Sequence, residues 1–124
     1  MALTKTVTTI VTNQDITANG ETTLANCTEI DLETAIQVEI EVLVTHNGTA
    51  TAGVVARVFF GAVTGDLGTA PGDECGIPFT AGAAVRYSFQ TRASPRFMKV
   101  TVKNLDENHA ATGVTVKATV QTVS

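Results

Sequence analysis

The side chains able to perform acid–base chemistry are few, and their spacing matches no reactive motif. His46 and His109 fall in stretches typical of turns, where exposed polar residues are common, and neither has the context of a Ser or Cys nucleophile. Glu39 and Glu41 share one face of an expected strand, about 7 Å apart. Paired carboxylates serve glycoside hydrolysis, but the chain has one Tyr and no Trp to form a sugar platform. We therefore expect a solvated strand face here and no enzyme.

Asp66, Asp73 and Glu74 are the acidic residues of a glycine-rich segment, 61–76. Carboxylates and backbone carbonyls are the ligands that calcium prefers, so a calcium site is an alternative for this loop. However, the spacing does not follow the calcium-loop pattern, and the chain has no Cys and His cluster at zinc-ligand spacing. The sequence therefore predicts no metal and no other cofactor.

Cys27 and Cys75 are the only cysteines. Two thiols permit one disulfide, but the sequence does not show that they meet in space. The first residues carry no basic region followed by an apolar run, so we expect no secretory signal and synthesis in a cytoplasm. Disulfides are rare there, which favours two small buried thiols. No apolar stretch approaches the roughly 20 residues of a membrane span, so we expect no membrane association.

Composition places the chain among globular domains and disfavours several classes of ligand. The 124 residues are 44% hydrophobic and 16% charged, with a net charge of -4, which indicates one domain spanning residues 1–124. The eight basic residues are scattered along the chain, whereas nucleic-acid binding needs a dense basic stripe. We expect no nucleic-acid partner and no small-molecule substrate.

Apolar and polar residues alternate with period two through most of the chain, which predicts antiparallel strands. The clearest run is 36–44, which ends at the turn signal of residues 46–48. Segment 52–61 is apolar on both faces, so we expect it in the centre of a sheet or against a partner. Asn19-Gly20 predicts a hairpin between 16–18 and 22–32. Further strands are expected at 83–91, 98–103 and 114–121. We predict an all-β fold, an antiparallel β-sandwich or jelly roll of roughly seven to nine strands.

Two segments are candidates for contact with other proteins. Segment 61–76 is long and irregular, and such loops in compact domains are usually functional. Residues 1–12 alternate weakly and predict an edge strand or an N-terminal arm; as an arm, 2–12 would add a strand to a neighbour's sheet. The partner contacts that we expect from these segments are Leu3, Val7, Val11, Asp66, Leu67, Asp73 and Glu74.

Two blocks of sequence carry a family resemblance. The first is Ile-Thr-Ala-Asn-Gly-Glu-Thr-Thr-Leu at 16–24, followed by Glu-Ile-Asp-Leu at 29–32, the strand at 36–44 and Asn47-Gly48. The second is Arg-Phe-Met-Lys-Val-Thr-Val-Lys-Asn-Leu at 96–105 with Gly-Val-Thr-Val-Lys-Ala-Thr-Val at 113–120. In this pattern the chain resembles small β-sandwich virion proteins of tailed bacteriophages, of the capsid decoration (cement) type.

The resemblance implies a non-enzymatic structural role. It implies a homo-oligomer, with a trimer favoured, that binds the major capsid protein or another virion protein and stabilises the shell. The location would be the virion, after synthesis in the host cytoplasm. A tail or head–tail component is the alternative within the same class. A carbohydrate- or cell-surface-binding β-sandwich module is the alternative from another class.

Overall fold

Eight strands and one short 3-10 helix make up the regular structure of residues 2–123, the part of the chain that the computed structural model describes. The elements are β1 (Leu3–Ile16), η1 (Leu24–Asn26), β2 (Ile30–Asp31), β3 (Ala35–Thr45), β4 (Val54–Gly61), β5 (Asp73–Gly76), β6 (Ala84–Thr91), β7 (Phe97–Asn104) and β8 (Ala111–Val123). Within residues 2–123, no helix is long and apolar enough to cross a membrane.

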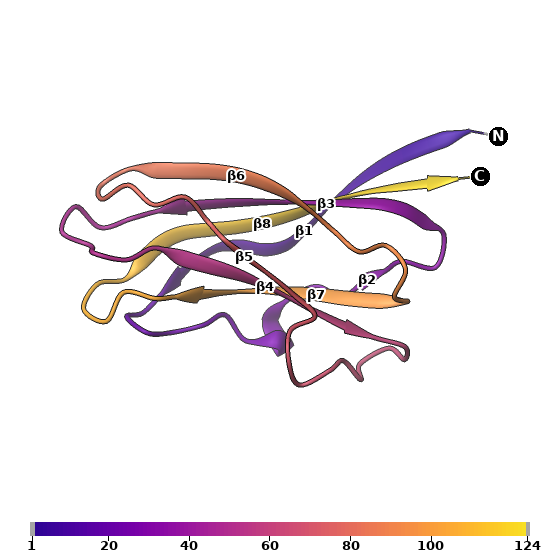
Figure 1. The fold of residues 1–124 in the computed structure, drawn as a ribbon, viewed down its shortest axis with the longest axis horizontal. Helices are drawn as coiled ribbons and strands as arrows, with labels where there is room; N and C mark the ends of the chain where they lie inside the picture. Colours follow the sequence, from indigo (N-terminus) through magenta and orange to yellow (C-terminus); the bar gives the residue numbers. More distant parts are fainter. Residues whose placement is uncertain (1, 124) are drawn as a thin grey trace.

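The strands form two antiparallel sheets that face each other (Figure 1). Sheet A has the order β1-β8-β3-β6, and sheet B has the order β2-β7-β4-β5. This is the strand order of a jelly roll, in which the chain crosses repeatedly between the two sheets. The prediction of an antiparallel all-β sandwich is confirmed.

The inner faces of the two sheets form one hydrophobic core. On β3, Val38, Ile40, Val42 and Val44 are fully buried, and the residues between them point outward, as the alternation predicts. Sheet B contributes a matching set of buried side chains from β4 and β7. Segment 52–61 lies in the centre of its sheet, because β4 has β7 on one side and β5 on the other. Both strand predictions are therefore confirmed, except at Ile36. The alternation of 36–44 places Ile36 on the inner face, but it is 53% exposed because the register shifts between Ala35 and Gln37.

The first and the last strand of the fold are paired with each other. Leu3 lies opposite Val123, and the pairing continues to Ile16 opposite Ala111. In Figure 1 the terminal ends of β1 and β8 extend together beyond the rest of the molecule. We call residues 3–7 of β1 with the end of β8 the terminal ribbon. Residues 1–12 were predicted as an arm or an edge strand, and residues 3–12 belong to an edge strand of sheet A.

A β-bulge in β1 changes which side chains face the core. The pairing is regular up to Thr9 opposite Lys117, and the next pair is Val11 opposite Val116, so Ile10 is an extra residue. An extra residue reverses the faces of the strand that follows it. Val11 therefore points into the core and is 1% exposed. The prediction that Val11 contacts a partner is wrong for this reason.

The Asn19-Gly20 turn is present, but it does not join a hairpin. Asn19 has a left-handed φ of 58°, and the Gly20 N–H donates to the Thr17 carbonyl at 2.8 Å. The chain after the turn runs along β7, with a bridge between Glu21 and Lys103, whereas β1 pairs with β8. The turn thus carries the chain from one sheet to the other, and the predicted hairpin is wrong.

Segment 61–76 was predicted to be irregular, and this is wrong for its last four residues. Asp73–Gly76 form β5, which pairs with β4 from Val58 to Val55. This edge strand has only two side chains on its inner face, Asp73 and Cys75, so it lacks the apolar alternation that predicts a strand.

Candidate interaction surfaces

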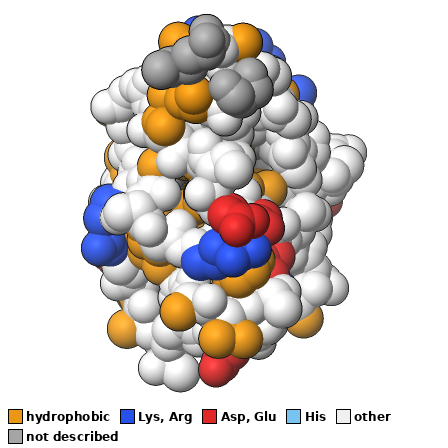
Figure 2. All heavy atoms as spheres, turned by 90° about the vertical axis from the view of Figure 1, so that its right-hand side faces the viewer, with side chains coloured by type: hydrophobic (Ala, Val, Ile, Leu, Met, Phe, Trp, Pro, Cys, Tyr) orange, Lys and Arg blue, Asp and Glu red, His pale blue; other side chains and the backbone are white. Residues whose placement is uncertain are grey.

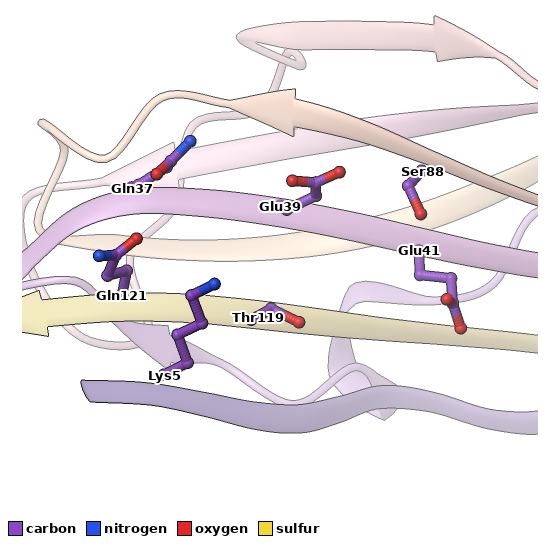
Figure 3. Close-up of a pocket in the computed structure, with 7 residues that line it drawn as sticks. All are labelled: Lys5, Gln37, Glu39, Glu41, Ser88, Thr119 and Gln121. Atoms are coloured by element: carbon purple, nitrogen blue, oxygen red, sulfur yellow. The ribbon is translucent and has the colours of Figure 1, made fainter. Parts of the chain in front are cut away.

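The outer face of sheet A carries a shallow polar hollow of about 260 Å³. Side chains from all four strands line it, and Figure 3 shows them standing on the outer surface of the sheet. The lining residues are Lys5, Gln37, Glu39, Glu41, Ser88, Thr119 and Gln121. No aromatic ring is among them, so the hollow lacks the stacking platform that a sugar site normally offers.

Charges on this outer face are only partly balanced within the chain. Glu41 lies 3.9 Å from the exposed guanidinium of Arg86, which is a weak surface pair. Lys5 and Glu39 make no ion pair with any residue that the structure describes. Glu39 and Glu41 thus lie on the solvated strand face that the alternation predicts, and both carboxylates can form ion pairs with another chain.

Sheet A has long free edges, whereas sheet B has short ones. The edge strands β1 and β6 contain 14 and 8 residues, but β2 and β5 contain only 2 and 4. Free N–H and C=O groups along a regular edge form a template for another strand, which proteins often block with proline, bulges or short strands. Neither 3–9 nor 84–91 contains a proline or a register shift. These two edges are therefore open to strand addition.

The terminal ribbon holds two large apolar side chains in solvent. Leu3 is 59% exposed and Val7 is 62% exposed. Figure 2 looks onto the end of the molecule that carries both termini, where apolar side chains reach the surface above a cluster of acidic and basic side chains. Of the predicted partner contacts, Leu3 and Val7 are the ones that combine an apolar side chain with high exposure.

Asp73 is committed to contacts within the chain. Its carboxylate accepts a hydrogen bond from Thr91 Oγ1 at 2.7 Å and lies 3.4 Å from Arg92 Nε. These contacts join the free edges of the two sheets, β5 and β6. The hydrogen bond from Thr91, followed by Arg92, lowers the pKa of Asp73. Arg92 in turn lies over the ring of Phe60, with the guanidinium carbon 4.6 Å from the ring centroid.

The other acidic residues of 61–76 lie apart from Asp73. Glu74 lies 3.4 Å from Arg57, and Asp66 belongs to an exposed turn bridged to Val63. Leu67 is half-buried, and this turn approaches the end of β4 closely. Among residues 2–123, no group of three or more His, Cys, Asp or Glu is placed to hold a metal ion. The calcium alternative therefore has no assembled set of ligands.

The sandwich is incompletely closed between β5 and β6. A cleft of about 420 Å³ lies there, with Cys75 and Phe89 on the inner faces of the opposing sheets. Tyr87 on the same face of β6 remains 39% exposed, and the nearby loop residue Phe79 remains 37% exposed. The aromatic face of β6 is thus only partly covered by the short β5.

The two cysteines are free thiols in different surroundings. Cys27 is buried and donates to the Thr23 carbonyl at 3.2 Å, so the prediction of a buried thiol is confirmed for it. Cys75 is half-exposed on the cleft beside β5, so that prediction is wrong for this residue. Loss of solvent around the sulfur raises the pKa of both thiols.

Asp106 ties two loops together at one end of the sandwich. Its Oδ1 accepts hydrogen bonds from the N–H groups of Asn108 and His109, both at 2.8 Å. Its Oδ2 accepts from the N–H groups of Thr51 at 2.7 Å and Ala52 at 3.3 Å. These donors, with Asn108 first and Thr51 next, hold the pKa of Asp106 far below its usual range. The loop 106–113 thus begins at a structural carboxylate.

His46 was expected in an exposed turn, but it is 4% exposed. Its ring packs edge-on against Phe79 with centroids 4.9 Å apart, and its Nε2 has no hydrogen-bond partner among the described residues. Burial lowers the pKa of His46. The signal was present in the sequence, because position 46 continues the inward series of Val42 and Val44 one step past the strand.

Comparison with known proteins adds little to this description. No family model matches the sequence, and no curated protein matches it. A solved chain from the disulfide-linked pili that form Bacillus endospore appendages aligns with 98% of this chain and 89% of its own length. The sequence identity is 18% and the TM-score is 0.43, which assigns neither a family nor a function.

Proposed function

We propose that this chain is a non-enzymatic structural subunit that assembles with other protein chains. The observation that carries the proposal is the terminal ribbon, where Leu3 and Val7 are more than half exposed on a regular edge strand. Apolar side chains of this kind favour protein docking, and interface cores are depleted in charge. The low charge content of the chain, 16%, fits the same role.

The assembly that we propose is the virion of a tailed bacteriophage, with the chain as a capsid decoration protein bound to the major capsid protein. This specific form rests on the resemblance carried by 16–48 and 96–120. A small subunit repeated many times needs only modest interfaces, because each copy that bridges several shell subunits adds its own binding energy. A tail or head–tail position is the alternative within the same particle.

The test is the protein content of purified particles. Virions of the phage that encodes the chain would be banded by density, and their heads and tails separated and analysed by quantitative mass spectrometry. We expect many copies of the chain per particle, in the head fraction. Recovery in the tail fraction would favour the alternative position, and absence from both fractions would overturn the virion role.

A second measurement concerns the oligomer. Light scattering on a sizing column would give the mass of the purified chain with and without a chelator. We expect an oligomer, such as a trimer, whose mass does not change on chelation. A loss of mass on chelation would instead indicate a metal site.

A further inference from the structure

The two free edges of sheet A are compatible in direction. Neighbouring strands of the sheet are antiparallel throughout, so β1 and β6 at its two ends run in opposite directions. A second copy placed in the same orientation beside β6 therefore offers its β1 antiparallel to β6. We propose that copies of this chain join head to tail in this way, with β1 of one copy added to β6 of the next. This inference rests on the assembly role proposed above and identifies the surface through which the copies would assemble.

The edges of sheet B disfavour a joint through that sheet. β2 and β5 are too short to template a long pairing, whereas 3–9 and 84–91 are regular. The main chain of these two segments makes no hydrogen bond beyond its sheet partner among the described residues. In Figure 1 the terminal ribbon also extends past the body of the molecule.

The faces of the strands select one register. Leu3 and Thr9 point outward with their partners on β8, and Gln90 points outward with Glu39 on β3. Antiparallel pairs place side chains on the same face, so outward residues of β1 must oppose outward residues of β6. Pairing Leu3 of one copy with Gln90 of the next, and Thr9 with Ala84, meets this condition over seven residues of each strand. A shift of two residues either brings the bulge at Ile10 against β6 or leaves the end of β6 unpaired.

On the inner face this register covers the exposed aromatic side of β6. Thr6 of the added strand lies opposite Tyr87, and Thr4 lies opposite Phe89. Tyr87 is 39% exposed in the single chain because β5 is too short to cover it. Pairs between aromatic and β-branched side chains on neighbouring strands stabilise sheets.

On the outer face the same register improves the charge balance. Lys5 of the added strand lies opposite Ser88, which neighbours Glu41 on β3. The Cα atoms of Lys5 and Glu41 would be roughly 10 Å apart across two strand spacings, a span that their side chains bridge. In a single copy, Arg86 is the cation beside Glu41, and Glu39 makes no ion pair within residues 2–123. Exposed pairs add little energy, so this contact serves mainly to select the register.

Another outward residue of the added strand, Val7, lies opposite Arg86. Val7 is 62% exposed in the single chain, and the aliphatic stem of an arginine is suited to cover it. Because the two surfaces of the joint are different, a joined pair of copies keeps one free β1 edge and one free β6 edge. Such heterologous contacts generate a ring or an open filament.

Disulfide trapping tests the register directly. In a Cys75→Ser background, the pair Lys5→Cys and Ser88→Cys places two thiols opposite each other between copies, on the solvent face. Mild oxidation is expected to give a ladder on a non-reducing gel that collapses on reduction. The ladder would end at the ring size for a closed ring, such as the trimer, and would continue to higher species for an open filament. The buried Cys27 remains in every variant. Absence of the ladder, at a concentration where light scattering shows an oligomer, would overturn the proposal.

The matched control moves one thiol to the other face. Thr6→Cys with Ser88→Cys places one thiol on the inner face and one on the outer face, so no ladder is expected. A ladder of equal yield from this control would show that the trapping is not specific and would also overturn the register. Thermal melts by circular dichroism would verify that both double variants are folded.

A charge reversal at one position provides a second, non-covalent test. Val7→Arg places a positive charge opposite Arg86 of the neighbouring copy, whereas Val7→Glu places a negative charge there. We expect the dissociation constant, measured by sedimentation equilibrium, to be about fivefold higher for Val7→Arg than for Val7→Glu. Equal constants would contradict the opposition of Val7 and Arg86.

The outcomes separate this interface from the virion role. A chain found in virions that gives no ladder would keep its proposed function and lose this interface. A chain that gives the ladder but is absent from virions would keep the interface and lose the phage role. A chain that is monomeric at all concentrations and gives no ladder would lose the interface, whatever its particle content.

Discussion

Asp106 is the clearest case of a single side chain that holds separate segments together. Its carboxylate accepts backbone hydrogen bonds from two loops and is nearly inaccessible to solvent. Loss of the charge weakens several charge-assisted hydrogen bonds at once. We expect Asp106→Asn to lower the midpoint temperature of thermal unfolding, measured by calorimetry, by more than an exposed Asp→Asn substitution does. Asp31→Asn, which removes an exposed pair with Arg96, is the control, and an equal loss in both variants would contradict this role.

His46 predicts a dependence of stability on mildly acid pH. Burial lowers its pKa below the value of 6.5 expected in the unfolded chain. Between these two pKa values the unfolded state binds a proton that the folded state does not bind. The free energy of unfolding is therefore expected to decrease as pH falls below about 6.5.

Urea unfolding between pH 7.5 and 5 would measure this decrease, with His46→Phe as the comparison. The variant should lose most of the slope, because Phe has no proton to bind. The carboxylates with lowered pKa, such as Asp73, lose their contribution only as pH falls below about 4, so they act in a separate range. An unchanged slope in the variant would contradict the assignment to His46.

At the scale of the element, two isoleucines of β3 differ in their burial. Ile40 is fully buried between the sheets, whereas Ile36 on the same strand is 53% exposed. Truncation of a buried isoleucine to alanine removes apolar contacts and leaves a cavity. We expect Ile40→Ala to cost about 3 kcal/mol of unfolding free energy, and Ile36→Ala to cost less than about 1 kcal/mol. Urea titration of both variants would measure this, and similar losses would contradict the packing described for β3.

Strands with a complete alternating pattern were predictable from the sequence, and the edges were not. β3 follows from its alternation and β4 from its apolar residues on both faces, and each pairs with a strand on both sides. β5 has no such pattern, since only Asp73 and Cys75 face inward. The bulge at Ile10 could not be predicted from the sequence. One extra residue hardly changes the composition of the strand, but it reverses the faces of the residues that follow.

The candidate surfaces were predictable only where a single strand carries them. Leu3 and Val7 share one face by simple alternation, and both are exposed. The acidic residues of 61–76 share a loop but not a site, because basic residues from other elements hold Asp73 and Glu74. The hollow on sheet A draws on four strands from positions 5 to 121, and no local pattern in the sequence brings such positions together.

At the scale of the whole molecule, β8 holds sheet A together. It lies between β1 and β3 and pairs with both along most of its length. Deletion of 111–124 would expose the buried faces of both neighbours, so we expect a chain without cooperative thermal unfolding by calorimetry. The control, deletion of 122–124, removes Thr122 and Val123, which are half-buried, and is expected to remain folded. A cooperative transition in the longer deletion would contradict this role of β8.

The central position of β8 also has a consequence for synthesis of the chain. Translation produces β1 first among the eight strands and β8 last, yet these two strands are direct neighbours. Until β8 has been translated, β1 and β3 lack the strand that lies between them in sheet A. The edge of β1 that later pairs with β8 then has no partner within its own chain. Sheet B has no such dependence, because β2, β7, β4 and β5 are all made before β8. A nascent chain is therefore expected to complete sheet A only after residues 111–123 have left the exit tunnel.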